Sequence, residues 1–181
     1  MCRLSITPFI ITGQSLILQV SSAVHSSFLP PAVSFDKQAC FQHRGLSSKP
    51  PYSSYWDLFS RYALSKLALI LSAAALQRRH PNIICASCDP GGAKTTGALS
   101  IWPAFLRPVM GLLYPSPAAG ARPVLFLAAG RDVAADRGRY KGAYVGNKCK
   151  ILPPSQLAQN LEVAENLWKS SEEALAPWIA A

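Results

Sequence analysis

The sequence has few acidic residues, no long apolar run and no dense block of like charges. It contains 9 Asp and Glu residues against 18 Lys and Arg residues, which gives a net charge of +9 over 181 residues. No apolar stretch approaches the roughly 20 residues that a helix needs to cross a bilayer, so we expect no stable membrane span. The sequence contains no run of five or more residues of like charge, so we expect no nucleic-acid partner. The positive charge leaves an acidic membrane surface or a phosphorylated cofactor open as an anionic partner.

The cysteine pattern and the N-terminal segment do not favour secretion. Secreted disulfide scaffolds usually carry an even set of cysteines, whereas this chain has five scattered ones. In residues 1–16 an arginine precedes an apolar stretch, as in a signal peptide, but Pro8, Thr12 and Gly13 interrupt it and no A-x-A-like cleavage site follows. We therefore expect a reducing, cytoplasmic location. The cysteines are Cys2, Cys40, Cys85, Cys88 and Cys149.

Strands and helices are predicted to alternate along the chain, which is typical of an α/β fold with a parallel sheet. Half of the residues are apolar, enough for a packed core. Ser116 and Pro117 suit the start of a helix, in which Pro123 should cause a kink or a late start. The predicted strands are Leu16–Val20, 83–87 and 140–145; the predicted helices are 60–79, one from Ser116, and 160–175 with Leu161, Ala164, Leu167 and Trp168 on one face.

Two tyrosine–lysine pairs share a four-residue spacing, and one of them falls on a predicted helix. Tyr62 and Lys66 would share a helix face, where the positive charge favours the phenolate and makes the tyrosine a usable proton donor. Tyr144 and Lys148 instead follow a strand, and Gly146 lies between them. We interpret this second pair as structural.

Other candidate motifs fail on spacing or context. Cys85 and Cys88 have the spacing of a redox motif but lie in a predicted buried strand, and no second cysteine pair completes a zinc site. The GGAKTT stretch lacks the glycines of a phosphate-binding loop at Cys88 and Ala93. The histidines, His25, His43 and His80, are too dispersed for a ligand cluster. We expect no metal site.

Taken in order, several segments resemble the short-chain dehydrogenase/reductase superfamily, and within it the branch of retinol-dehydrogenase-like and fungal secondary-metabolism reductases. They are VSSA after a strand, YALSKLAL opening a helix, a DPGGAKT turn, GAR, GRYKGAYV and AENLWKSSEEAL. The similarity spans roughly residues 16–175. The resemblance implies a doubly wound, Rossmann-like sheet and a nicotinamide cofactor, NADP or NAD.

The resemblance also implies roles for individual residues. Tyr62 would be the general acid/base, and Ser22 would orient the substrate carbonyl. Lys66 would bind the nicotinamide ribose and lower the pKa of the tyrosine. The nicotinamide end would be lined by Pro90, Gly91, Ala93 and Thr95, besides Tyr62 and Lys66. Two structural interpretations remain open from the residues alone: Ser22 as a turn serine and Thr95 as a helix cap.

The sequence departs from the family pattern at its beginning. Residues 1–21 contain Gly13 alone, where the family has a glycine-rich turn that receives the pyrophosphate. We therefore expect an N-terminally truncated chain, the C-terminal portion of the fold without its first βαβ units: a non-family segment at 1–15, a partial domain at 16–176 and a tail at 177–181. The strand at Leu16–Val20 would then expose an apolar edge, favouring association with a second copy or another subunit.

Two functions from different classes follow from these observations. The first is an NAD(P)-dependent oxidoreductase that interconverts a carbonyl and an alcohol on a small-molecule substrate. Residues 26–56 and 96–114 would line the substrate side, and their Phe, Trp and Pro content favours a bulky apolar substrate. The alternative is a catalytically inactive homologue that binds no dinucleotide and is inert or associated with a subunit. A basic binding module is a weaker third hypothesis.

Overall fold

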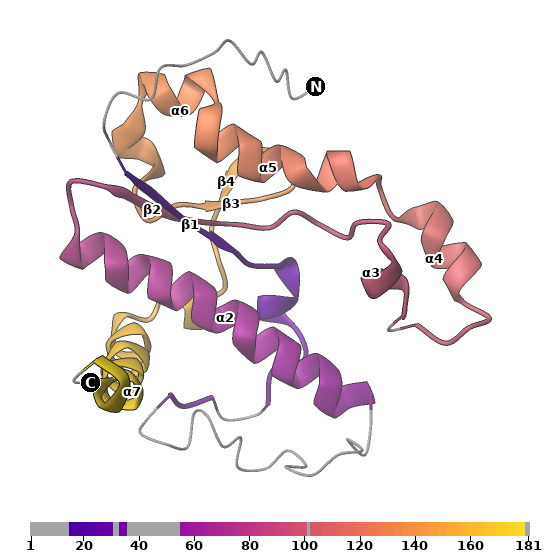
Figure 1. The fold of residues 1–181 in the computed structure, drawn as a ribbon, viewed down its shortest axis with the longest axis horizontal. Helices are drawn as coiled ribbons and strands as arrows, with labels where there is room; N and C mark the ends of the chain where they lie inside the picture. The colour runs from indigo at the N-terminus through magenta and orange to yellow at the C-terminus, as the bar shows by residue number, and fades with distance from the viewer. Residues whose placement is uncertain (1–14, 31–32, 36–54, 101, 180–181) are drawn as a thin grey trace.

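The computed structural model describes residues 15–30, 33–35, 55–100 and 102–179, which form an α/β fold around a four-stranded sheet (Figure 1). The strands follow one another in the order β1-β2-β3-β4. β1 pairs in parallel with β2 and β2 with β3, whereas β3 and β4 are antiparallel. The strands are β1 (Leu16–Val20), β2 (Ile84–Cys88), β3 (Tyr144–Val145) and β4 (Ile151–Leu152).

Helices cover both faces of the sheet (Figure 1). α2 and α7 lie against one face, and α5 and α6 lie against the other. The α-helices are α2 (Tyr55–Arg79), α3 (Thr96–Ser100), α4 (Arg107–Leu113), α5 (Pro117–Ala129), α6 (Arg131–Ala135) and α7 (Leu161–Ile179). Short 3-10 helices are η1 (Ala23–Ser26), η2 (Arg137–Tyr140) and η3 (Leu157–Gln159).

Strand β2 divides the core into two clusters because its side chains alternate between the two faces of the sheet. Ile84, Ala86 and Cys88 pack with Leu127 of α5 and Val133 of α6. On the other face, the long helix α2 packs with α7 and with Tyr144 of β3. All five residues of β2 are buried, as expected for a central parallel strand covered on both sides.

Helix α2 contributes much of the core on its face of the sheet. Leu67 and Leu71 have no exposed surface, and Ala63 and Ala75 are equally buried. By length and composition alone, its segment Asp57–Arg79 is apolar enough to cross a membrane, which the sequence analysis did not expect. Its apolar side chains instead pack against β1, β2 and α7, as in the core helix of a globular domain.

The predicted strands agree with the structure except near the C-terminal side of the sheet. β1 has the predicted bounds and β2 is shifted by one residue. The strand predicted at 140–145 is wrong in extent: β3 covers Tyr144 and Val145, and the chain before it forms the 3-10 helix η2, capped by the Asp136 side chain. β4 was missed because its two residues, both exposed, carry no alternating pattern.

The predicted helices are confirmed with changes at their ends. α2 begins at Tyr55 rather than Ser60. The Ser116 side chain caps α5 by accepting a hydrogen bond from the Ala119 N–H, so the late start is wrong, and Pro123 is buried within the helix. Asn160 caps α7 through its side-chain oxygen.

On α7, Ala164 and Leu167 face the core as predicted, but Leu161, which lies in the first turn of the helix, is 61% exposed. The helix continues to Ile179, past the end predicted at residue 175. β1 is the terminal strand of the sheet as described, and Val20 at its end is 40% exposed. Association through its outer edge stays a prediction; residues 1–14 lie outside the described part of the chain.

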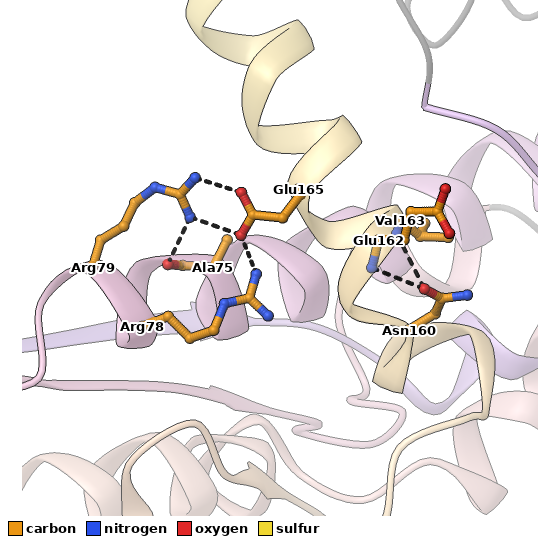
Figure 2. Close-up of polar contacts among 7 residues, drawn as sticks. All are labelled: Ala75, Arg78, Arg79, Asn160, Glu162, Val163 and Glu165. Carbon is orange, nitrogen blue, oxygen red and sulfur yellow. Dashed lines mark hydrogen bonds and ion pairs between the residues drawn. The ribbon is translucent and has the colours of Figure 1, made fainter.

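Ion pairs from Arg78 and Arg79 to Glu165 connect the C-terminal end of α2 to α7 (Figure 2). The Glu165 carboxylate accepts hydrogen bonds from Arg78 and, at 2.7 Å, from Nη2 of Arg79. The Arg79 guanidinium also donates to the Ala75 carbonyl and lies 4.2 Å from the centre of the Trp168 ring. The hydrogen bond from Arg79 is the main cause of a Glu165 pKa lowered to about 2. Desolvation, the next largest effect, opposes it, and the Arg78 hydrogen bond and both positive charges add to the lowering.

Truncating a fully buried leucine of α2 tests the described core. Leu71→Ala removes methyl groups from the core cluster that α2 forms with Ala164 and Leu167 of α7, so we expect the free energy of unfolding to fall by about 2–5 kcal/mol. Urea denaturation measures the change. Leu58→Ala on the same helix, where the side chain is 39% exposed, should cost much less; equal losses would contradict the packing.

The Glu165 group predicts a pH-dependent contribution to stability. Because the pKa of Glu165 is lowered by folding, its contribution is complete above about pH 4.5 and is lost as the pH falls toward about 2. Glu165→Gln should therefore be less stable than the natural chain at pH 6, with the difference shrinking through this window. Thermal unfolding of both proteins across pH measures it, with Glu172→Gln on the same helix as control. A difference independent of pH would contradict the account.

Candidate active site

Ser21 joins three elements at the end of β1. Its side chain is buried, and its hydroxyl donates a 2.7 Å hydrogen bond to the Lys66 carbonyl on α2. Its backbone N–H donates at 2.7 Å to the carbonyl of Cys88, the last residue of β2. The first serine of the VSSA segment is therefore a structural residue that sets where α2 crosses the ends of the two strands.

Lys66 reaches the same strand end from the helix. Its ammonium Nζ donates a 3.0 Å hydrogen bond to the Val20 carbonyl and lies 5.4 Å from the centre of the Tyr62 ring. Tyr62 and Lys66 therefore share a helix face, as their spacing predicted. Tyr62 is 45% exposed, so its phenol is accessible to a ligand at this edge of the sheet.

Ser22 follows directly and begins the 3-10 helix η1. Its hydroxyl oxygen accepts a 3.4 Å hydrogen bond from the Val24 N–H, and the side chain is half-buried. Val20 and Ser21 both form hydrogen bonds with Lys66 of α2, and Ser22 is the next residue along the chain. The turn role and the predicted substrate contact are compatible, because an accepting hydroxyl can still donate its proton.

His25 supports the backbone of Ser22, a role that the sequence analysis missed. Its Nδ1 lies 2.8 Å from the Ser22 carbonyl, and its Nε2 accepts a 3.2 Å hydrogen bond from the Ser155 N–H. This pair of partners requires the neutral ring with its proton on Nδ1. The buried ring also meets Tyr144 edge to face at 5.1 Å. A single histidine three residues after a serine carries no recognisable signal, so only the structure shows that it fixes the Ser22 backbone.

The turn after β2 lies at the same edge of the sheet, where open α/β sheets bind their ligands. Asp89 is buried and holds the turn through its N–H to the Val145 carbonyl and its Oδ1, which accepts from the Gly91 N–H at 2.9 Å. Gly91 has φ +74°, and a Cβ there would lie 3.0 Å from Nδ2 of Asn147. Glycine is therefore required after Pro90.

Ala93 and Thr95 lie further along this turn. Ala93 packs against α5, because its Cβ is 3.2 Å from where a Cβ on Gly120 would be. The Thr95 hydroxyl accepts a 3.1 Å hydrogen bond from the Ala98 N–H and so caps α3. The structure thus shows the helix-cap role of Thr95, and its hydroxyl proton remains available to a ligand.

The competing motifs are structural in the described chain. Tyr144 is buried in the core and burial raises its pKa, while Lys148 is exposed in the following turn. Cys85 and Cys88 are fully buried free thiols. Burial is the main cause that raises the pKa of Cys88 to about 11; Asp89 adds to it and Lys66 opposes it. The residues that the structure describes contain no group of three or more metal-ligating side chains.

The edge formed by the ends of β1 and β2 therefore carries an accessible phenol beside an ammonium, and Ser22 follows β1 by two residues. A phenol and a cation on one helix face can exchange a proton with a bound oxygen and stabilise negative charge.

Comparisons with known proteins identify relatives in fungi; no family model matches the chain. The chain is 40% identical over 135 residues to "Short chain dehydrogenase/reductase dpmpH" of Macrophomina phaseolina, covering 70% of this chain and 66% of that protein. It is 36% identical over 119 residues to the protein dpfgH of Gibberella zeae and 37% identical over 119 residues to dpchH of Colletotrichum higginsianum, both also named short chain dehydrogenase/reductase.

The chain spans 66%, 34% and 30% of the lengths of these three relatives. A crystal structure of an uncharacterized protein from Mycobacterium paratuberculosis has a similar fold, with a TM-score of 0.54 at 22% identity over 88% of this chain and 50% of that one. This likeness supports an α/β fold that corresponds to part of a Rossmann-like domain. From the sequence identity to its fungal relatives, the chain belongs to the short-chain dehydrogenase/reductase superfamily.

Proposed function

We propose that this protein is an NAD(P)-dependent oxidoreductase of the cytoplasm that interconverts a carbonyl and an alcohol. The observation that carries the proposal is the position of Lys66. Its ammonium lies beside the Tyr62 ring and is bonded to the carbonyl of Val20, two residues before Ser22. The family membership supports oxidoreductase chemistry. The reaction and the residue roles below are the proposal.

Each of the three side chains has a task that its surroundings permit. The exposed Tyr62 phenol gives a proton to the substrate oxygen during reduction and takes it back during oxidation. The Lys66 ammonium, fixed by the Val20 carbonyl, holds ribose hydroxyls. Ser22 donates its hydroxyl proton to the substrate oxygen, and His25 holds the backbone of this serine in place.

The residues present fit the nicotinamide-ribose end of a dinucleotide. Gly91 leaves a space that a Cβ would fill against Asn147, and Pro90 lies beside it at the strand end. Lys66, Ala93 and Thr95 would complete the contacts to this end of the cofactor. The sequence contains no G-x-x-x-G-x-G turn for the pyrophosphate. A bound nicotinamide supplies or accepts the hydride, and the protein contributes orientation and proton transfer.

An aromatic group beside the site supports an apolar substrate. Phe59 precedes Tyr62 by one helical turn; its ring stacks on Phe28 at 5.2 Å and lies 6.3 Å from Trp102. These rings connect the segment after η1, α2 and the segment before α4, two of which the sequence analysis assigned to the substrate side. A bulky apolar ketone or alcohol, such as a polyketide, terpenoid or lipid-like compound, would match them.

Cofactor binding tests the proposal against the alternative of an inactive homologue. We expect saturable binding of NADPH or NADH, followed by nicotinamide fluorescence, and loss of that binding in the double variant Tyr62→Phe with Lys66→Ala. The reason is that Lys66 supplies the charged contact to the ribose.

The matched control uses the pair with the same spacing outside the site. Tyr144→Phe with Lys148→Ala should retain binding, because Tyr144 is buried in the core and Lys148 lies in an exposed turn. An absence of binding by the natural chain at millimolar cofactor would reject the oxidoreductase and favour the inactive homologue.

The two adjacent serines should have separable effects. Ser22→Ala should lower kcat on hydrophobic ketones by about 10²-fold with little change in stability, since it removes a donor to the substrate oxygen. Ser21→Ala should lower the free energy of unfolding by about 1–3 kcal/mol, since it leaves the Lys66 carbonyl without this donor. Steady-state kinetics and urea denaturation of both variants separate the roles. Unchanged turnover in Ser22→Ala would contradict its assignment.

A further inference from the structure

The outer face of α4 is apolar and open to solvent. Its exposed fractions are 78% for Phe105, 51% for Val109, 86% for Leu112 and 69% for Leu113. The spacing of four, three and one residues places these side chains on one face of a helix and the turn before it. Such a concentration of exposed large apolar residues on a short helix marks an interaction surface.

The opposite side of α4 is apolar as well. Leu106, Met110 and Tyr114 are half-buried, and Gly111 is buried. Apart from Arg107 at its start, α4 is apolar on both sides, and such a helix is normally enclosed by protein or in contact with lipid. Figure 1 shows α4 instead at one end of the molecule, beyond α5 and away from the sheet.

The stretch of sequence that contains α4 carries positive charge only. Residues 90–131 contain no Asp or Glu, and their charged residues are Lys94, Arg107, Arg122 and Arg131. The exposed Lys94 reaches α4, with its Cε 3.6 Å from the Cβ position on Gly111. The exposed Arg107 begins α4, and its guanidinium donates to the carbonyls of Trp102 and Ser100. One cation, Arg107, therefore lies on α4 itself, and the second, Lys94, contacts the helix on the side of Gly111.

A second exposed apolar surface, at the end of α7, shows why this charge matters. Leu175 is 52% exposed and Trp178 is 82% exposed, but Glu172 and Glu173 are exposed on the same segment. Carboxylates next to apolar side chains are repelled by an anionic surface. Of these two apolar surfaces, the one on α4 is therefore the one whose charge complements an anionic partner.

We propose that the outer face of α4, defined by Phe105, Val109, Leu112 and Leu113, docks on an anionic lipid bilayer. The four apolar side chains enter the boundary between headgroups and acyl chains, and Arg107 contacts the lipid phosphates or carboxylates, while Lys94 adds positive charge from the Gly111 side of the helix. The association is peripheral and reversible, because a single short helix face provides the apolar contact. It requires neither a bound cofactor nor turnover.

Vesicle cosedimentation of the full chain tests the proposal. Vesicles of phosphatidylcholine with 30 mol% phosphatidylserine serve as the anionic surface, and pure phosphatidylcholine vesicles as the neutral one. We expect binding to the anionic vesicles that weakens as NaCl is raised from 50 to 500 mM. Leu112→Ser with Leu113→Ser should weaken this binding about tenfold or more, and Lys94→Gln with Arg107→Gln should weaken it to a similar extent.

The matched control is Leu161→Ser with Leu175→Ser on α7, which removes two leucines that are 61% and 52% exposed. It should bind as the natural chain does, and circular dichroism checks that all variants are folded. Equal binding to neutral and anionic vesicles, or undiminished binding by both α4 variants, would overturn the proposal. Light scattering that shows a dimer lost on Leu112→Ser with Leu113→Ser would overturn it in favour of a second copy on this face.

Discussion

Two hydrogen bonds between Lys66 and the end of β1 determine the geometry of the site. The backbone carbonyl of Lys66 accepts from Ser21, and its ammonium donates to Val20. Together they fix both the height of α2 along the sheet and the rotation of the helix. Because Tyr62 lies one helical turn earlier on the same face, the same two bonds place the phenol at the strand end. A change in the crossing of α2 would separate the phenol, the ammonium and Ser22 together.

Much of the fold was predictable because its larger elements have strong local signals. β1 is a short apolar run followed by polar residues, and Pro81 ends α2 by its lack of a backbone donor. The elements missed are those whose formation depends on distant partners. β4 forms its two-residue pairing with β3 although its side chains are exposed, and η2 replaces the predicted start of a strand because Asp136 caps it.

The same distinction applies to the candidate site. The Tyr62 and Lys66 pair was recognisable because helical spacing alone puts the two side chains together. The separation of roles between Ser21 and Ser22 was not, since it depends on Lys66 and Cys88, which are distant in sequence. His25 likewise acts through Ser155, 130 residues further along the chain. Long-range hydrogen bonds of this kind leave no periodic pattern in the sequence.

Transfer of deuterium tests the account most directly. The natural chain is incubated with NADPH or NADH deuterated at the reactive C4 position of the nicotinamide and with a hydrophobic ketone, and the alcohol is analysed by mass spectrometry. The account predicts an alcohol carrying one deuterium on the carbinol carbon, formed by the natural chain and lost in Tyr62→Phe. Absence of the deuterated alcohol at saturating ketone and millimolar cofactor, from protein shown to be folded, would contradict it.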